Sequence, residues 1–148
     1  MKKTRSVTIC TSASFYKQAW KVKEDLENRG LRVWIPLTAK KMNKTRNYKV
    51  SMYKTWYKDP AKYARKAFLM HKHFEEIKKA DAILVINLKK KGVEGYIGGN
   101  VLMEMGLAFY LKKSIYLWQE ISKISPNYEE VVGMQPIVIS ENLGKILA

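Results

Sequence analysis

Several features that would restrict the class of this protein are absent from its sequence. The 148-residue chain has one cysteine, Cys10, so an internal disulfide is impossible. Its longest strongly apolar run, 82–86, is far shorter than the roughly 20 residues that a membrane-spanning helix needs. The basic N-terminus is not followed by the apolar segment of a secretory signal. We therefore expect a cytoplasmic protein with no membrane association.

Acidic residues are scarce. The chain has 13 Asp and Glu against 28 Lys and Arg, a formal net charge of +15, which favours anionic partners such as nucleotides, nucleic acid or an acidic protein surface. Residues 38–66 contain ten lysines and arginines but one acid, Asp59, and therefore carry nine of these fifteen net charges. Five aromatic residues lie among those lysines: Tyr48, Tyr53, Trp56, Tyr57 and Tyr63.

This basic, aromatic-rich segment, residues 38–66, has several possible roles. Its rings and charges can stack bases while neutralising phosphates, as single-strand-binding proteins do. It can equally cover a bound nucleotide or contact another subunit, and a solvated lysine-rich face is the commonest reason for such a run. Nucleic-acid binding is therefore possible but not the interpretation that we favour.

The order of the predicted elements indicates the fold. A hydrophobic fraction of 47% and a charged fraction of 28% are ordinary for one globular domain, here residues 1–148. Short apolar runs alternate with segments of helical periodicity, which predicts a doubly wound, Rossmann-like α/β domain with a five-stranded parallel sheet in the order 2-1-3-4-5. The expected strands are 7–10, 31–36, 82–86, 114–118 and 137–139. The main helices are one with apolar positions from 15 to 26 that Gly30 ends, one from 60 to about 79 and one over 101–111, with short helices near 129–132 and at the C-terminus.

The predicted topology places a ligand site at the point where the strand order reverses. That crevice lies beyond the carboxyl ends of the first and third strands, so residues 11–14 and 87–104 should face it. In the second segment Gly98 and Gly99 allow close approach of a ligand, while Asn100 can cap the next helix. A tight turn with an N-cap is the alternative explanation of the same residues.

Glu104 is the most unusual residue of that crevice. It lies on a helix that is apolar nearly all round, and a buried charge is costly unless it is matched. A capping box does not explain it, because the position three residues earlier, Val101, is not the Ser or Thr that this motif requires. We therefore interpret Glu104 as a functional carboxylate whose side chain points back toward the glycine loop.

Two segments resemble the nucleoside 2-deoxyribosyltransferase superfamily, which includes nucleoside 5′-monophosphate N-glycosidases. They read HFEEIKKADAILVIN (73–87) and YIGGNVLMEMGLAFYLKKSIYLW (96–118), and the resemblance extends over about 7–36 and 71–140. Its most specific element is the glycine-rich loop that leads to x-E-x-G-x-A, here residues 103–108. The resemblance implies that Glu104 attacks the anomeric carbon of the sugar and forms a covalent glycosyl intermediate.

The resemblance also implies roles for other residues. His73 aligns with a family acid and can protonate or orient the leaving base, although its spacing alone favours a surface or half-buried structural histidine. Substrate-binding positions are expected after the first strand and in the glycine-rich region. These residues are Thr11, Ser12, Ser14, Asn87, Tyr96, Gly98, Gly99 and Asn100.

Together these observations predict cleavage or transfer of the N-glycosidic bond of a nucleoside or nucleoside 5′-monophosphate, without metal or organic cofactor. Relatives complete their sites across subunits, and helix 101–111 is apolar around most of its circumference, so we expect a homodimer or higher homo-oligomer. The alternative is a non-catalytic nucleotide-binding or nucleic-acid-binding module.

Overall fold

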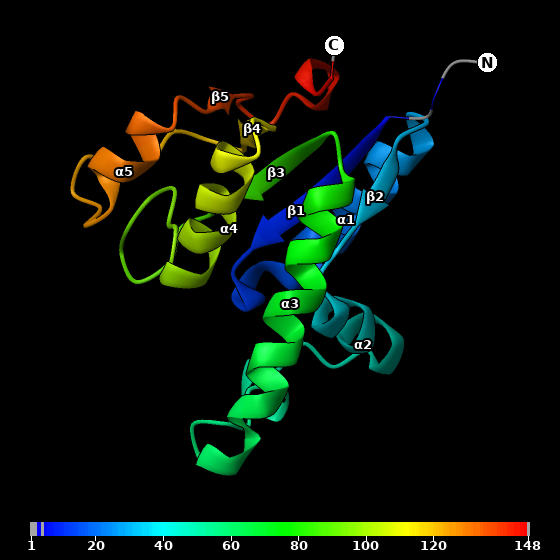
Figure 1. The fold of residues 1–148 in the computed structure, drawn as a ribbon, viewed down its shortest axis with the longest axis vertical. Coiled ribbons are helices and arrows are strands. Elements are labelled where there is room, and N and C mark those ends of the chain that lie inside the picture. Colours follow the sequence, from blue (N-terminus) through cyan, green and yellow to red (C-terminus); the bar gives the residue numbers. More distant parts are fainter. Residues whose placement is uncertain (1–2, 4, 148) are drawn as a thin grey trace.

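Five parallel strands form the sheet in the part of the chain that the structure describes, in the order β2-β1-β3-β4-β5 (Figure 1). The structure is a computed structural model and describes residue 3 and residues 5–147. The predicted fold class and strand order are thus confirmed. The strands are β1 (Ser6–Thr11), β2 (Arg32–Trp34), β3 (Ala82–Ile86), β4 (Ser114–Leu117) and β5 (Ile137–Val138).

Helices connect successive strands, as crossovers in a parallel sheet require. All five residues of β3 are buried, which explains why this central strand reads as one continuous apolar run. The α-helices are α1 (Tyr16–Asn28), α2 (Leu37–Thr45), α3 (Tyr63–Lys79), α4 (Gly99–Tyr110) and α5 (Tyr128–Gly133), and the 3-10 helices are η1 (Ala13–Phe15), η2 (Val50–Met52), η3 (Pro60–Lys62) and η4 (Leu143–Lys145).

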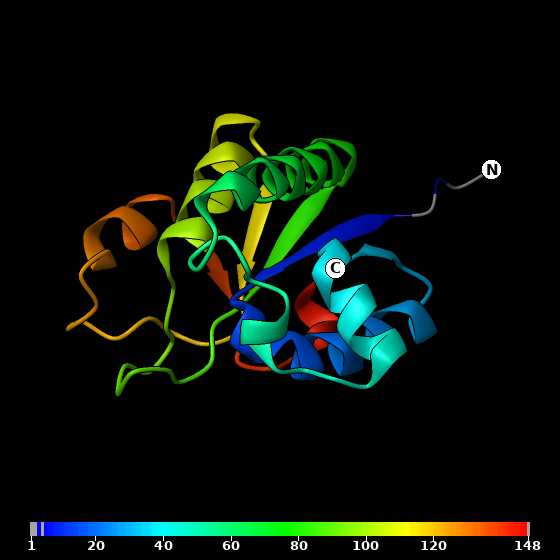
Figure 2. The ribbon, with the colours of Figure 1, turned by 90° about the horizontal axis from the view of Figure 1, so that it is seen from below.

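Two apolar layers pack against opposite faces of the sheet. Figure 2 shows α3 and α4 on one side, with α1 and the C-terminal segment on the other. Successive strand residues alternate between these layers. Ile9 packs with Leu26 on the α1 side, whereas Cys10 packs with Met105 on the α3/α4 side. The position of a residue along its strand therefore decides whether its side chain points to the α1 side or to the α3/α4 side of the sheet.

The register of the two central strands brings their carboxyl ends level. β1 pairs with β3 from Val7 opposite Ala82 to Thr11 opposite Ile86. The loops that follow both strands consequently start at the same edge of the sheet. This edge is the predicted ligand crevice.

The basic, aromatic-rich segment is more regular than its charge indicated. It opens with α2, a helix absent from our sequence prediction, which begins directly after Pro36. Ala39 and Met42 are fully buried and lie three residues apart, so α2 has an apolar face. The lysines around these two residues concealed that short periodicity. Among the residues that the structure describes, no helix is both long and apolar enough to cross a membrane.

The predicted start of α3 is correct in position, although its first turn is tighter than expected. Asp59 accepts a hydrogen bond from the backbone amide of Ala61 at 3.1 Å and caps the 3-10 helix η3, with Pro60 in its first turn. The α-helix proper then runs from Tyr63 to the predicted end at Lys79. Its C-terminal half lies over the sheet, where Ile77 is buried, while Tyr63 and Phe68 near its start are about half exposed.

Candidate active site

A cavity of about 420 Å³ lies beyond the carboxyl ends of β1 and β3. Its walls come from the loop after β1, the helix α3, the start of α4 and the basic, aromatic-rich segment. Eight of the ten sequence-predicted site residues line it: Thr11, Ser12, His73, Tyr96, Gly98, Gly99, Asn100 and Glu104. The structure thus brings the two predicted segments of the crevice together.

Ser14 and Asn87 do not line the cavity. Ser14 is exposed, and no side-chain hydrogen bond caps the helix that begins beside it. Asn87 is fully buried, and its amide nitrogen donates to the carbonyl oxygens of Gly95 and Gln119 at 3.3 and 2.8 Å. Its amide oxygen accepts from the backbone amide of Gln119 at 3.1 Å. Asn87 therefore ties the loops after β3 and β4 together instead of reaching a ligand.

Gly95 in the loop after β3 is a residue that sequence reasoning missed. Its φ of +64° lies in the left-handed region, and an added Cβ would come within 2.3 Å of the carbonyl oxygen of Glu120. Only glycine fits this close approach of two loops. Because Tyr96 follows directly, Gly95 fixes the wall of the cavity that Tyr96 forms.

The carboxylate of Glu104 is held on one side only. Its Oε1 accepts a hydrogen bond from Asn100 Nδ2 at 2.9 Å, whereas Oε2 has no hydrogen-bond partner among the described residues. Burial raises the pKa of the Glu104 carboxyl, and the nearby charge of His73 partly opposes this effect. Glu104 therefore has one oxygen fixed by a hydrogen bond and one oxygen that faces the imidazole of His73 without a hydrogen bond.

Asn100 does not cap α4, contrary to our prediction. The helix begins one residue earlier, with Gly98 at the cap position and no side-chain cap. Asn100 therefore lies inside the first turn, where its side chain reaches Glu104 four residues on. The amide oxygen of Asn100 also accepts from Lys66 Nζ at 2.9 Å. A chain of two hydrogen bonds therefore joins Lys66 of α3, through the side-chain amide of Asn100, to the carboxylate of Glu104 on α4.

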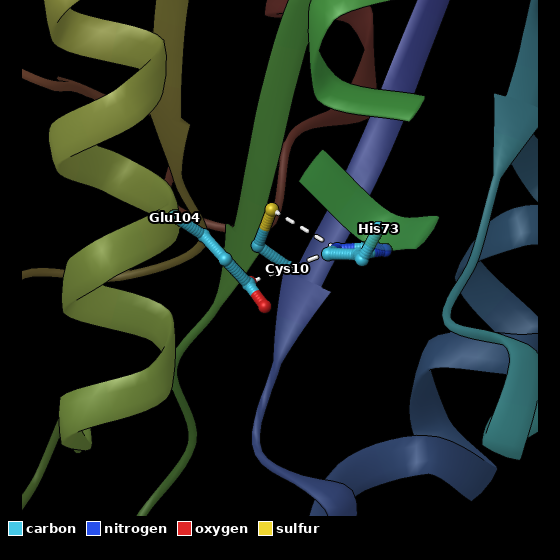
Figure 3. A group of neighbouring side chains, drawn as sticks. All are labelled: Cys10, His73 and Glu104. Atoms are coloured by element: carbon cyan, nitrogen blue, oxygen red, sulfur yellow. Dashed lines mark hydrogen bonds and ion pairs between the residues drawn. The ribbon is translucent and has the colours of Figure 1, made fainter. Parts of the chain in front are cut away.

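His73 is buried between the carboxylates of Glu76 and Glu104, and Figure 3 shows its ring beside Glu104 and Cys10. Its Nε2 lies 3.6 Å from Glu104 Oε2, and its Nδ1 lies 3.4 Å from Glu76 Oε2. Burial acts to lower the pKa of the His73 imidazole, but the charges of Glu104 and Glu76 outweigh it, so the pKa is raised. A protonated imidazole between two carboxylates compensates part of their buried charge.

Glu76 and Cys10 belong to this cluster, although we did not predict them as site residues. Glu76 follows His73 by three residues, so both lie on one face of α3, and this spacing was the available signal. Cys10 is buried, as we expected, but its Sγ lies 3.6 Å from His73 Nε2. Side chains alternate between the two faces along β1, and this alternation turns Cys10 toward α3 and α4. That pattern could have indicated the contact between Cys10 and His73.

Four lysines line the cavity and make its wall positive: Lys54, Lys66, Lys90 and Lys91. Lys90 Nζ donates to Ser12 Oγ at 2.9 Å and lies 5.3 Å from the centre of the Tyr96 ring, while Lys66 Nζ lies 5.6 Å from that of Trp56. Burial lowers the pKa of Lys54, Lys66 and Lys90. The charges of the other two lysines lower that of Lys54 further. An anionic ligand would relieve this repulsion.

The basic, aromatic-rich segment contributes directly to the cavity. Tyr53, Lys54, Trp56 and Tyr57 line it, and Trp56 is nearly fully buried. Of the roles open to this segment, a wall over a ligand is therefore the one with structural support. Its aromatic rings offer apolar surface for a base, and its lysines offer charge for a phosphate.

Comparison with models of known protein families finds no match for this chain, and no curated protein matches it.

Proposed function

We propose that this chain breaks the N-glycosidic bond of a nucleoside or, preferentially, a nucleoside 5′-monophosphate, with Glu104 as the nucleophile. The observation that carries the proposal is the asymmetry of the Glu104 carboxylate. Asn100 holds Oε1, while Oε2 is left without a hydrogen bond beside the imidazole of His73. Such an arrangement orients a nucleophile without neutralising it.

The proposed reaction has two steps. In the first, a carboxylate oxygen of Glu104 bonds to C1′ of the sugar as the C1′–N bond to the base breaks, and His73 donates a proton to the leaving base. In the second, water or another base attacks C1′, the neutral His73 imidazole accepts the proton that the attacking group loses, and Glu104 is released as a carboxylate. Glu76 supports both steps because its charge, 3.4 Å from His73 Nδ1, stabilises the imidazolium.

The lysine cluster favours a phosphorylated substrate over a free nucleoside. Lys54, Lys66 and Lys90 line the same cavity as Glu104, and burial lowers the pKa of each of them, with neighbouring lysine charges adding to the effect at Lys54 and Lys90. A phosphate contributes the matching negative charge and several acceptor oxygens. We therefore expect a 5′-monophosphate to bind more tightly than the corresponding nucleoside.

The proposal is tested by incubating the protein with a panel of nucleosides and nucleoside 5′-monophosphates and measuring free base by chromatography. Wild-type protein should release base from at least one compound, and Glu104→Gln should not. Glu75→Gln, which alters an exposed carboxylate on α3, is the matched control and should behave as wild type. Nucleotide binding without any base release would instead identify a non-catalytic nucleotide-binding module.

We also propose that the protein forms a homodimer or higher homo-oligomer. Five large aromatic or apolar side chains on α3 and α4 are about half exposed or more: Tyr63, Phe68, Met103, Phe109 and Tyr110. Exposed groups of this size are candidates for a protein–protein contact. A second copy of the chain is the partner that the family resemblance favours.

A further inference from the structure

Cys10, His73 and Glu104 form a cluster whose composition is that of a metal site. Each comes from a different element, β1, α3 and α4 respectively, and each is buried. One possible ligand atom of each residue lies within 4.8 Å of those of the other two (Figure 3). A thiol, an imidazole and a carboxylate are the three side-chain types that bind Zn²⁺.

The distances within the cluster suit a tetrahedral ion. Zinc bonds of about 2.0–2.3 Å at tetrahedral angles place neighbouring ligand atoms about 3.3–3.6 Å apart. His73 Nε2 lies 3.6 Å from Cys10 Sγ and 3.6 Å from Glu104 Oε2. The nitrogen–oxygen separation is long for a hydrogen bond, whereas the nitrogen–sulfur separation is within the range of one, and both are close to the edge of a zinc tetrahedron. The third separation, between Cys10 and Glu104, is no more than 4.8 Å, so the three side chains would have to close around the ion along that edge.

The surroundings of the cluster complete this pattern. Glu76 Oε2 lies 3.4 Å from His73 Nδ1, which leaves Nε2 directed toward Cys10 and Glu104. Metal-binding histidines commonly present their second nitrogen to a carboxylate in this way. His73 and Glu104 also line the cavity. A fourth coordination position is therefore open on the cavity side, as in zinc sites with three protein ligands and one exchangeable ligand.

We propose that Cys10 Sγ, His73 Nε2 and Glu104 Oε2 bind Zn²⁺, and that the bound ion reversibly blocks the chemistry of Glu104. The zinc site follows from the geometry alone, whereas the inhibition rests on the proposed glycosidic function. As the ion binds, the Cys10 thiol and the His73 imidazolium each release a proton to solvent, and bonds from sulfur and Nε2 to zinc form in their place. The Glu104 oxygen that would attack the sugar is then occupied by the metal.

Cobalt(II) is the probe for the zinc site, because a thiolate ligand gives Co²⁺ a charge-transfer absorption. Tag-free full-length protein should develop this band on titration, saturate at one ion per chain, and lose the band when Zn²⁺ is added. Mg²⁺ should not displace cobalt, since it prefers oxygen ligands. Absence of a thiolate band in folded wild-type protein would overturn the proposal.

Variants identify the ligands. Cys10→Ser should abolish the thiolate band, and His73→Gln should weaken binding of Co²⁺ and Zn²⁺ strongly. Glu76→Gln should weaken it by about 10- to 100-fold, the usual effect of losing the partner of a metal-binding histidine. His71→Gln, an exposed histidine on the same helix, is the matched control and should bind as wild type. Circular dichroism verifies folding, and Cys10→Ala replaces Cys10→Ser if the latter does not fold.

The inhibition is measured separately from the binding. Zn²⁺ should suppress base release by wild-type protein, and a chelator should restore it. Any base release that Cys10→Ser retains should be far less sensitive to Zn²⁺. A thiolate band in a protein that releases no base would retain the zinc site and reject the glycosidic function. Base release that Zn²⁺ leaves unchanged, at concentrations that saturate the cobalt site, would reject the inhibitory role.

Discussion

The two faces of the sheet are packed in contrasting ways. On the α1 side, Ile9, Leu26 and Leu84 belong to a layer of fully buried apolar side chains. The α3/α4 side has a comparable apolar layer, but His73, Glu76 and Glu104 are buried within it beside Cys10. Burying these charged groups costs free energy that the α1 side does not lose. One face therefore stabilises the fold through apolar packing alone, while the other gives up stability to hold a cluster of ionisable side chains.

Glu104→Gln should have the largest effect and tests the reactive face directly. Removal of a nucleophile lowers turnover by about 10⁴-fold or more. Nucleotide binding should survive because the amide keeps the shape of the side chain. The melting temperature should hold or rise because a neutral group costs less to bury, while Glu76, 3.4 Å from His73 Nδ1, remains to pair with the imidazolium. Base release and thermal unfolding of the same preparation give both answers. A variant that melts earlier with unchanged base release would make Glu104 a structural charge.

Neighbouring residues of β1 allow the two faces to be compared in one strand. Ile9 and Cys10 are both fully buried but point to opposite layers. Ile9→Ala should lower the free energy of unfolding by about 2–5 kcal/mol, the usual cost of emptying a packed apolar site. Cys10→Ala removes a single sulfur atom and should cost only about 1 kcal/mol. Equal losses in denaturant titrations would show that the two layers contribute alike.

The outer surface of the α3/α4 layer offers a smaller test. Phe109 is 54% exposed and is placed to contact a second copy of the chain. Phe109→Glu should weaken self-association by about 2 kcal/mol, a typical effect at an interface hot spot. Sedimentation velocity at micromolar concentration measures it, with Lys112→Glu as the control for added negative charge. Monomeric wild-type protein under these conditions would remove the basis for the predicted oligomer.

The smallest effect concerns pH and the lysine wall. The lowered pKa of Lys54 means that its ammonium loses its proton below the ordinary lysine value of about 10.4. The affinity for a nucleoside 5′-monophosphate should therefore fall by severalfold as pH rises through that alkaline window. Stability should change in the opposite direction, because the unfolded chain there binds more protons than the folded chain.

Calorimetric titrations at a series of pH values measure this affinity. Lys54→Gln should reduce the loss of nucleotide affinity at alkaline pH. Lys58→Gln, which alters an exposed lysine of the same segment, should leave the pH dependence of the affinity unchanged. An affinity that stays constant up to about pH 10.4 would show that the lysine wall does not contact the phosphate.

Local pattern was sufficient to predict much of the fold. β3 was predicted with its observed bounds because a strand buried on both faces is one uninterrupted apolar run. The helix α2 was missed because two buried residues, Ala39 and Met42, give a short periodicity among many lysines. Secondary structure with a long, clean period can be predicted from the sequence, whereas a short helix depends on tertiary packing.

The site was predictable in position but not in its pairings. The switch-point rule placed Thr11 and Glu104 at one cavity, because strand order alone determines that edge of the sheet. It did not indicate that Glu76 would contact His73, or that Asn100 would bridge Lys66 and Glu104. Such pairings depend on where each helix begins and how it is rotated, and a shift of one residue at the start of α4 changed the role of Asn100.

The chain of hydrogen bonds from Lys66 through Asn100 to Glu104 would, under the proposed function, couple substrate recognition to reactivity. Lys66 lies on the cavity wall, and its hydrogen bond orients the amide that restrains the carboxylate. A phosphate that draws the ammonium of Lys66 toward itself would compete with Asn100 for it and loosen the hold on Glu104. The arrival of an anion would thereby reach the carboxylate before any bond is made, whereas a nucleoside without a phosphate would leave these hydrogen bonds intact.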